Sequence, residues 1–215
     1  MEEIELPEPG PGEVLVRVHT AAITRDELAW PTDRLPAIPS YELSGVVADG
    51  GDEEVVALTP FDRDGVAADY AVVPTTVLAP KPPELSHVEA AALPMGALSG
   101  QQGLFVHGEL QPGERVLVTG ASGGVGHLAV QLARHAGAEV VAEEPFDLVF
   151  DTAGADPLPR AEPASQGLGM RKGSPRCSAA NASALASCDI QHNLPALASC
   201  GDTLERLAGT LERED

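Results

Sequence analysis

Residues 114–142, ERVLVTGASGGVGHLAVQLARHAGAEVVA, decide the fold class of this chain. They begin with a short apolar run rich in β-branched residues (115–119), which is typical of a buried parallel strand. Four glycines follow within seven residues, at Gly120, Gly123, Gly124 and Gly126. Apolar residues then recur at the spacing of one helical face, at Val125, Leu128, Ala129, Leu132 and Ala133. With a further strand at 139–142, the pattern predicts strand, glycine turn, helix and strand.

A helix that opens directly from a glycine turn can bind anions, because its first N–H groups have no partner within the helix. Glycine also lets the backbone approach a bound group closely, since it has no Cβ atom. In a strand–turn–helix unit the usual anion is a dinucleotide pyrophosphate. We assign this role to Gly120, Ala121, Ser122, Gly123, Gly124, Val125 and Gly126. The alternative is a glycine-rich turn that only packs a helix on a sheet.

The bulk composition limits the partners of the 215-residue chain. Its formal net charge is −20, which argues against binding to nucleic acid or to anionic membrane surfaces. The acidic N-terminus is unlike a signal peptide, and no apolar run reaches the ~18 residues of a membrane helix. The three cysteines, Cys177, Cys188 and Cys200, do not form a disulfide pattern. We therefore expect a soluble cytoplasmic protein.

The first 80 residues are predicted to be rich in strands and turns. Strands are expected at 13–19, 43–48, 54–58 and 68–73, separated by glycine and proline, as in a small barrel or sandwich. Ser86 and Glu89 have the spacing of a capping box and predict a helix start, with a second helix over 98–106.

Six short motifs, spread almost continuously over residues 4–142, carry a family resemblance. They are PGEVLVRV (11–18), AITRD (22–26), IPSYELSGVV (38–47), AADYA (67–71), EAAALP (89–94) and PGERVLV (112–118). Together with the glycine loop they resemble the medium-chain dehydrogenase/reductase superfamily. The most similar branch is the zinc-free quinone oxidoreductases, the zeta-crystallin-like enzymes.

The resemblance implies an α/β fold with two domains and an active site in the cleft between them. Residues 1–85 would form a GroES-like, β-rich catalytic domain, and residues 86–156 an incomplete Rossmann domain. The implied activity is hydride transfer from a nicotinamide cofactor to a quinone or to an activated C=C or C=O group of a small molecule. A homodimer is compatible with this resemblance.

The resemblance also assigns individual residues. Tyr41 and Thr24 match positions beside the substrate, and Ser99 matches a helix position whose hydroxyl faces the nicotinamide carboxamide. The alternatives are a half-buried tyrosine in the barrel and a solvated helix serine. The zinc-dependent branch would need a cysteine near Thr24 and a histidine before Glu42, so we expect no metal.

The family pattern breaks after Ala142. The chain passes from Glu143 directly to FDLVFDTAG (146–154), which resembles the fourth Rossmann strand and its turn, so an internal unit is missing. The bridge from the second to the fourth strand is shorter than parallel crossovers normally are. We consider this crossing implausible: either residues 140 and 141 are not paired as usual, or the segment does not fold as in the family.

The end of the chain departs further from the family. Residues 157–200 have no sustained period and are expected to be irregular or disordered, and a frameshift or a wrong splice junction is one explanation. Residues 201–215 are predicted to contain a C-terminal helix. The fifth and sixth Rossmann strands are not recognisable.

Two questions stay open at this stage. The family favours NADPH, whereas Glu143, about twenty residues past the loop, is placed to bind the ribose hydroxyls of NADH. The family resemblance and the position of Glu143 therefore disagree. We follow the resemblance and prefer NADPH, with NADH as a possible alternative. The chain is either a zinc-independent NAD(P)H-dependent oxidoreductase or an inactive truncated remnant that at most binds a dinucleotide.

Overall fold

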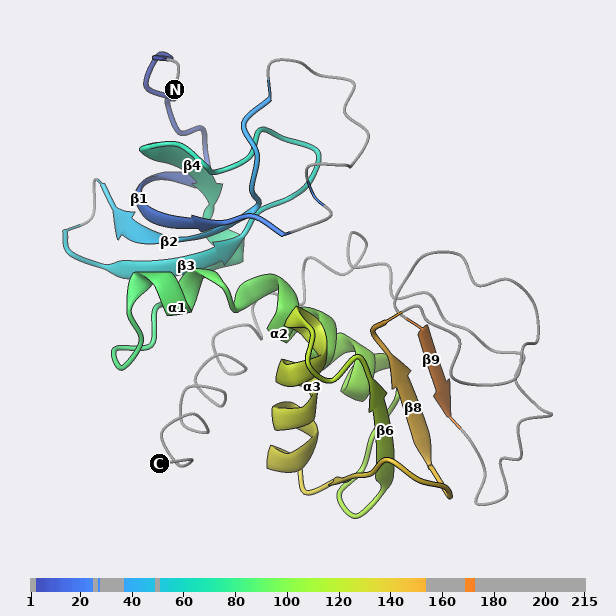
Figure 1. Ribbon diagram of the computed structural model, residues 1–215. Helices are drawn as coiled ribbons and strands as arrows, with labels where there is room; N and C mark the ends of the chain where they lie inside the picture. Colours follow the sequence, from blue (N-terminus) through green and yellow to red (C-terminus); the bar gives the residue numbers. More distant parts are fainter. Residues whose placement is uncertain (1–2, 25–26, 28–36, 49–50, 154–168, 173–215) are drawn as a thin grey trace. The chain divides into compact units, whose positions relative to one another are not determined.

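The computed structural model describes residues 3–24, 27, 37–48, 51–153 and, for the backbone, 169–172 (Figure 1). The described residues form two compact units, the first ending at Met95 and the second beginning at Gly96. This division lies ten residues beyond the predicted domain boundary at 85, because the helix that follows residue 85 packs on the first sheet. The expected C-terminal helix at 201–215 and most of 157–200 lie outside the described residues.

The first unit is a five-stranded antiparallel sheet with the order β4-β1-β2-β3-β5. Its strands are β1 (Glu13–Ala22), β2 (Glu42–Val47), β3 (Glu54–Leu58), β4 (Tyr70–Pro74) and β5 (Leu78–Pro80). A short 3-10 turn, η2 (Thr75–Val77), joins the last two strands. All four predicted strands are present, so the β-rich character of this unit is confirmed.

Small aliphatic side chains fill the interior of the first unit. Val16, Leu43, Val56 and Leu58 are each at most 1% exposed. Strand β1 carries a bulge between Val18 and Thr20, where its register with β2 shifts. A bulge bends a strand and increases its twist, which helps a sheet to curl around such a core.

Helix α1 (His87–Ala91) packs against β1 and β2. It begins with the predicted capping box: the Ser86 hydroxyl accepts from the Glu89 N–H, and the Glu89 carboxylate accepts from the Ser86 N–H at 2.9 Å. Helix α2 (Pro94–Gln101) follows and continues as a π-helical segment, η3 (Gln102–His107). The second predicted helix is therefore present but begins four residues earlier than expected.

The second unit is a four-stranded sheet with the order β7-β6-β8-β9 (Figure 1). Its elements are β6 (Arg115–Thr119), α3 (Gly124–His135), β7 (Glu139–Val140), β8 (Leu148–Asp151) and β9 (Gly169–Lys172). Strands β7 and β8 run parallel to β6 on its two sides, and β9 runs antiparallel to β8. The predicted strand–turn–helix–strand unit is confirmed. The four described residues of the stretch expected to be irregular form β9.

The predicted apolar face of α3 covers this sheet. Leu128, Ala129, Leu132 and Ala133 are buried, while Val125 is half-buried. Phe150 of β8 is fully buried and reaches η3, where a Cβ atom on Gly103 would lie 2.6 Å from its ring. Glycine at 103 therefore lets the helical segment approach the sheet closely.

The expectation that β7 cannot connect to β8 is wrong. Strand β7 has only two residues, and both pair with the first two residues of β6. Strand β8 starts beside the same part of β6, with Val116 opposite Leu148. The seven residues 141–147 therefore cross at the amino end of β6 and need not return along its length. The strand order 2-1-4 survives the loss of the internal unit.

Candidate functional site

The glycine loop connects the end of β6 to the start of α3. Gly120 has a φ of 67°, a conformation that side chains disfavour, and its carbonyl oxygen accepts from the Gly123 N–H at 2.8 Å. A Cβ atom on Gly126 would collide with the same carbonyl oxygen. These two glycines therefore have separate roles, since one allows the turn and the other lets the helix approach it.

The start of α3 is open to a ligand. Gly123 is the N-cap residue and provides no side-chain hydrogen bond to the helix. Residues 121–124 are exposed. The first N–H groups of an α-helix lack intrahelical partners and carry the positive end of the helix dipole, so this end suits a phosphate group.

The end of β8 lies beside the loop and adds residues that the sequence reasoning missed. The Thr119 hydroxyl donates to Asp151, and the Thr152 hydroxyl donates to the Thr119 carbonyl at 2.7 Å. A Cβ atom on Gly120 would lie 2.7 Å from the Thr152 Oγ1 atom. The sequence could have indicated these residues, because they follow or end two predicted parallel strands. Parallel strands place their carboxyl ends at one edge of the sheet, and ligands of such sheets bind there.

Glu143 is not brought to the glycine loop. Its carbonyl oxygen accepts from the Arg115 guanidinium at 3.5 Å, and the neighbouring Pro145 carbonyl accepts from the same group at 2.7 Å. Arg115 is the first residue of β6, whereas the loop follows Thr119 at the other end. This placement gives no support to a contact between Glu143 and a ribose.

Ser99 lies within α2 and is only 1% exposed. The alternative interpretation, a solvated helix serine, is therefore wrong. Its role toward a nicotinamide stays a prediction.

In the first unit, the backbone beside Thr24 and that beside Tyr41 are joined by a carboxylate that the sequence reasoning did not single out. Glu27 is 7% exposed, and it accepts from the Thr24 N–H at 3.3 Å and from the Ser40 N–H. Ser40 has a φ of 72°, and its hydroxyl donates to the Ala22 carbonyl at 2.7 Å. Glu27 thus links Thr24 to Ser40, the residue that precedes Tyr41.

Tyr41 lies just before β2 and is half-buried. Its ring packs edge-on against Phe61, with 4.8 Å between the ring centroids. Its carbonyl oxygen accepts from the Thr59 N–H at 2.7 Å. Both the backbone and the ring are therefore well fixed, as a packing role and a substrate-facing role would each require.

Glu42, the first residue of β2, is a second buried carboxyl in this unit. It is 2% exposed, and its Oε2 atom accepts from the Met95 N–H at 2.7 Å. Burial raises its pKa to about 7, helped by the charge of Glu27 and opposed by the Met95 hydrogen bond. A carboxyl group with such a pKa can gain or lose a proton near neutral pH, as general acids and bases must.

Comparisons with known proteins agree with these two units, although no protein-family model matches the sequence. A quinone-oxidoreductase homolog of spinach is 33% identical over 163 residues, which cover 65% of this chain and 49% of that protein. The quinone oxidoreductase of Thermus thermophilus, solved also as its complex with NADPH, is 35% identical with a TM-score of 0.57, and the match covers 65% of this chain and 47% of that one. An alcohol dehydrogenase superfamily protein of Novosphingobium aromaticivorans is 32% identical with a TM-score of 0.60, covering 66% and 48%.

The chain belongs to the medium-chain dehydrogenase/reductase superfamily and is quinone oxidoreductase-like. The first unit of this superfamily member corresponds to the GroES-like domain and the second to part of the Rossmann domain. The chain spans about half the length of the relatives it matches.

The structure also bears on membrane spanning and on metal binding. No helix within the described residues of this superfamily member is long and apolar enough to cross a membrane. The spinach relative is named chloroplastic, so a cytoplasmic location stays a prediction. Within the same residues, no group of three or more histidine, cysteine or carboxylate side chains is arranged to hold a metal ion.

Proposed function

We propose that the chain is an NAD(P)H-dependent oxidoreductase that acts on a quinone or on an activated C=C or C=O group of a small molecule. The observation that carries this proposal is the glycine loop, with its uncapped, exposed helix start at the carboxyl end of a parallel strand. The loop suits a pyrophosphate because residues 121–124 are exposed and the N-cap residue, Gly123, offers no side-chain hydrogen bond to the first N–H groups of α3. The Thermus thermophilus relative, solved as its complex with NADPH, supports a nicotinamide cofactor.

NADPH is the proposed cofactor, with NADH as the second choice. The Thermus thermophilus relative has been solved with NADPH, and Glu143 lies away from the loop, which weakens the basis for NADH. The bound cofactor would supply the hydride. The loop residues would hold its pyrophosphate, and Ser99 would face its carboxamide.

Catalysis without zinc is part of the proposal. Thr24 and Tyr41 occupy the places where the zinc-dependent branch needs a cysteine and a histidine. Their hydroxyl groups would orient the substrate by hydrogen bonds, and the phenol of Tyr41 would donate a proton. Glu27 would keep the backbone of both residues in place.

A second candidate function is a remnant that binds a dinucleotide without catalysis. It is favoured by the length of the chain, which spans about half of its relatives. In this case the loop would still hold a pyrophosphate, but the nicotinamide would lack part of its site.

Titration of the purified protein with NADPH and with NADH, followed by nicotinamide fluorescence, tests both candidates. The enzyme proposal expects saturable binding, tighter for NADPH, and reduction of a simple benzoquinone in the presence of the cofactor. Binding without quinone or enone reduction would support the remnant. Absence of binding to either cofactor would refute both, and sedimentation of the same sample would test the expected homodimer.

A further inference from the structure

The second half of strand β1 has a free edge. The pairing of β1 with β4 ends at Arg17–Tyr70, whereas its pairing with β2 continues to Ala22–Glu42. Among the described residues, 19–22 are therefore paired on one side only. An unpaired edge presents a row of N–H and C=O groups that can accept another strand.

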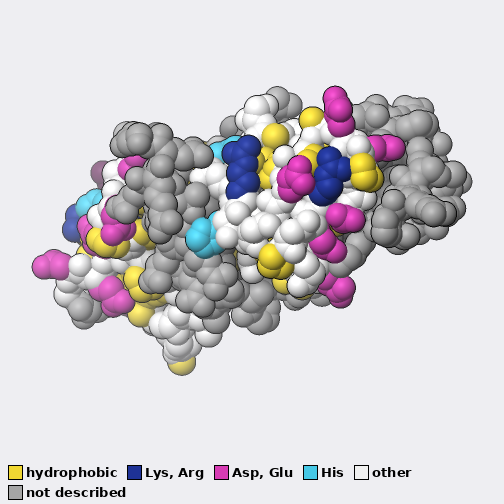
Figure 2. Space-filling model, turned by 90° about the horizontal axis from the view of Figure 1, so that it is seen from below, with side chains coloured by type: hydrophobic (Ala, Val, Ile, Leu, Met, Phe, Trp, Pro, Cys, Tyr) yellow, Lys and Arg dark blue, Asp and Glu magenta, His cyan; other side chains and the backbone are white. Residues whose placement is uncertain are grey.

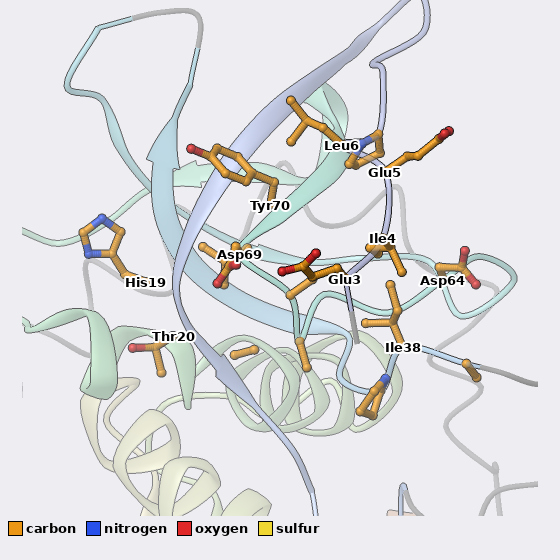
Figure 3. Close-up of a pocket in the computed structure, with 17 residues that line it drawn as sticks. Glu3, Ile4, Glu5, Leu6, His19, Thr20, Ile38, Asp64, Asp69 and Tyr70 are labelled. Atoms are coloured by element: carbon orange, nitrogen blue, oxygen red, sulfur yellow. The ribbon is translucent and has the colours of Figure 1, made fainter. Parts of the chain in front are cut away.

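A cavity of about 1050 Å³ opens at this edge (Figure 3). It is lined by residues 18–21 of β1, by 37–39 and 67–70, by Asp64 and by the N-terminal residues 3–7. All of these belong to the first unit, so the cavity does not depend on the glycine loop. Its volume is at the upper end of small-ligand pockets, which measure about 300–1,000 Å³.

The walls of the cavity are apolar in part. Val18 and Ile38 contribute from the sheet side, and Ile4 and Leu6 from the N-terminal segment. Ile4 is 60% exposed and Leu6 is 59% exposed, although both are large apolar side chains. Covering such side chains from water would contribute roughly 25 cal/mol per Å².

The charged groups of the cavity are acidic. Its carboxylates belong to Glu3, Glu5, Asp64 and Asp69, and none of the described residues that line it is a lysine or arginine. Figure 3 shows the carboxylates of Glu3 and Asp69 near the middle of the cavity. The ion pairs found among the described residues involve other carboxylates. Four carboxylates with no cationic partner among the described residues favour a positively charged occupant.

We propose that this cavity binds an extended peptide whose apolar and basic residues alternate, and that the peptide adds to the edge of β1 as a further strand. Alternate side chains of a strand point to opposite faces, so apolar ones would cover the walls while basic ones face the carboxylates. Main-chain hydrogen bonds to residues 19–22 would fix the register. A second copy of this chain fits less well, because the net charge of −20 would repel it.

The test uses the full chain and a fluorescent hexapeptide of alternating lysine and valine, with anisotropy as the measurement. A peptide of identical sequence with N-methyl groups on alternate residues is the first control, because it cannot donate the strand hydrogen bonds. We expect the methylated peptide to bind about tenfold more weakly, and a glutamate–valine peptide not to bind. The affinity should also fall as salt rises to about 150 mM.

Two matched double variants locate the site. Asp64→Asn with Asp69→Asn should weaken peptide binding about tenfold. Asp52→Asn with Glu84→Gln changes the net charge equally at exposed positions outside the cavity and should leave the affinity unchanged.

Several results would overturn the proposal. They are no binding of the lysine–valine peptide, equal binding of the methylated peptide, equal binding of a polyamine of the same charge, and equal effects of the two double variants. Self-association of the protein that the Asp64 and Asp69 changes abolish would assign the cavity to a second copy instead. None of these results depends on a nicotinamide cofactor, so the outcome is separate from that of the proposed enzyme activity.

Discussion

At the scale of single residues, Gly120 and Gly126 are the most tightly packed glycines of the loop. Gly126 must approach the Gly120 carbonyl oxygen, whereas Gly124 has no neighbouring atom within 4 Å of an added Cβ atom. Gly126→Ala is therefore expected to displace the helix start and to weaken NADPH binding at least about tenfold. Arg134→Ala, at an exposed position in the last turn of α3, is the control and should bind NADPH like the unchanged protein.

The measurement is the same fluorescence titration, with circular dichroism of each variant to check the fold. If the folded Gly126→Ala protein binds NADPH normally, the loop is not the pyrophosphate site.

Glu42 allows a prediction about pH. Its pKa rises from 4.5 to about 7 in the folded protein, so the folded state holds more protons than the unfolded state between these values. The free energy of unfolding should therefore fall as pH rises from about 4.5 to about 7, by roughly 3 kcal/mol for this group. Glu42→Gln keeps an acceptor for the Met95 N–H and removes the titration.

Urea unfolding at several pH values between 5 and 8 checks this, since the variant should gain stability relative to the unchanged protein as pH rises. Glu84→Gln, at an exposed position, is the control. A constant stability difference between Glu42→Gln and the unchanged protein would contradict the prediction.

The Glu27 cluster illustrates what sequence reasoning could not reach at this scale. A glutamate three residues after Thr24 has the pattern of a solvated turn residue, and nothing local indicates that it is buried. Its role arises because Ser40, thirteen residues later, adopts a positive φ and directs its N–H toward the carboxylate. Hydrogen bonds between distant segments leave no periodic signal in the sequence.

At the scale of elements, the crossover between β7 and β8 is fixed by hydrogen bonds to Arg115. The Arg115 N–H donates to the Asp147 carboxylate at 2.8 Å, and the Asp147 N–H donates to the Arg115 carbonyl at 2.8 Å. Asp147→Ala leaves a half-buried N–H without its partner and is expected to cost about 1–2 kcal/mol of stability.

Glu143→Ala is the control for this crossover, because only the carbonyl oxygen of that residue is used there. It should change stability by less than about 0.5 kcal/mol. Urea unfolding of both variants gives the comparison, and equal losses would contradict the assigned role of Asp147. The Glu143 variant also tests the ribose contact, since unchanged affinity for NADPH and NADH would exclude it.

Helices and strands with a clear periodic pattern of apolar residues could be predicted from the sequence. Strands whose presence or length depends on pairing with a neighbouring strand could not. The apolar spacing of residues 128–133 identified the buried face of α3, and the capping box identified the start of α1. The four residues of β9 show no alternation, and they form a strand because β8 has an edge that pairs with them. The crossover was misjudged for a similar reason, since the length of β7 depends on its pairing with β6 and not on its own residues.

At the scale of the whole molecule, the glycine loop and the family motifs identified both units, although the chain spans only half of its relatives. Composition identified the acidic character. Figure 2 shows acidic side chains spread over the visible face, with lysine and arginine at few places. Such a distribution destabilises the folded state by repulsion among like charges.

A net charge of −20 therefore predicts how stability responds to salt. Salt screens charges over about 10 Å at 0.1 M and about 3 Å at 1 M. Since the four ion pairs found among the described residues cannot balance the excess of carboxylates, screening should remove more repulsion than attraction. The melting temperature is thus expected to rise by several degrees between about 0.02 M and about 0.5 M sodium chloride at neutral pH.

Differential scanning calorimetry measures this rise, and a sugar at matched osmolality controls for effects of the solvent that do not involve charge. The same increase should shrink near pH 4.5, the isoelectric point of the sequence, because the net repulsion vanishes there. A melting temperature that falls with salt at neutral pH would mean that attractive pairs outweigh the repulsion. In that case the charged surface would stabilise the folded state through local ion pairs instead of destabilising it by repulsion.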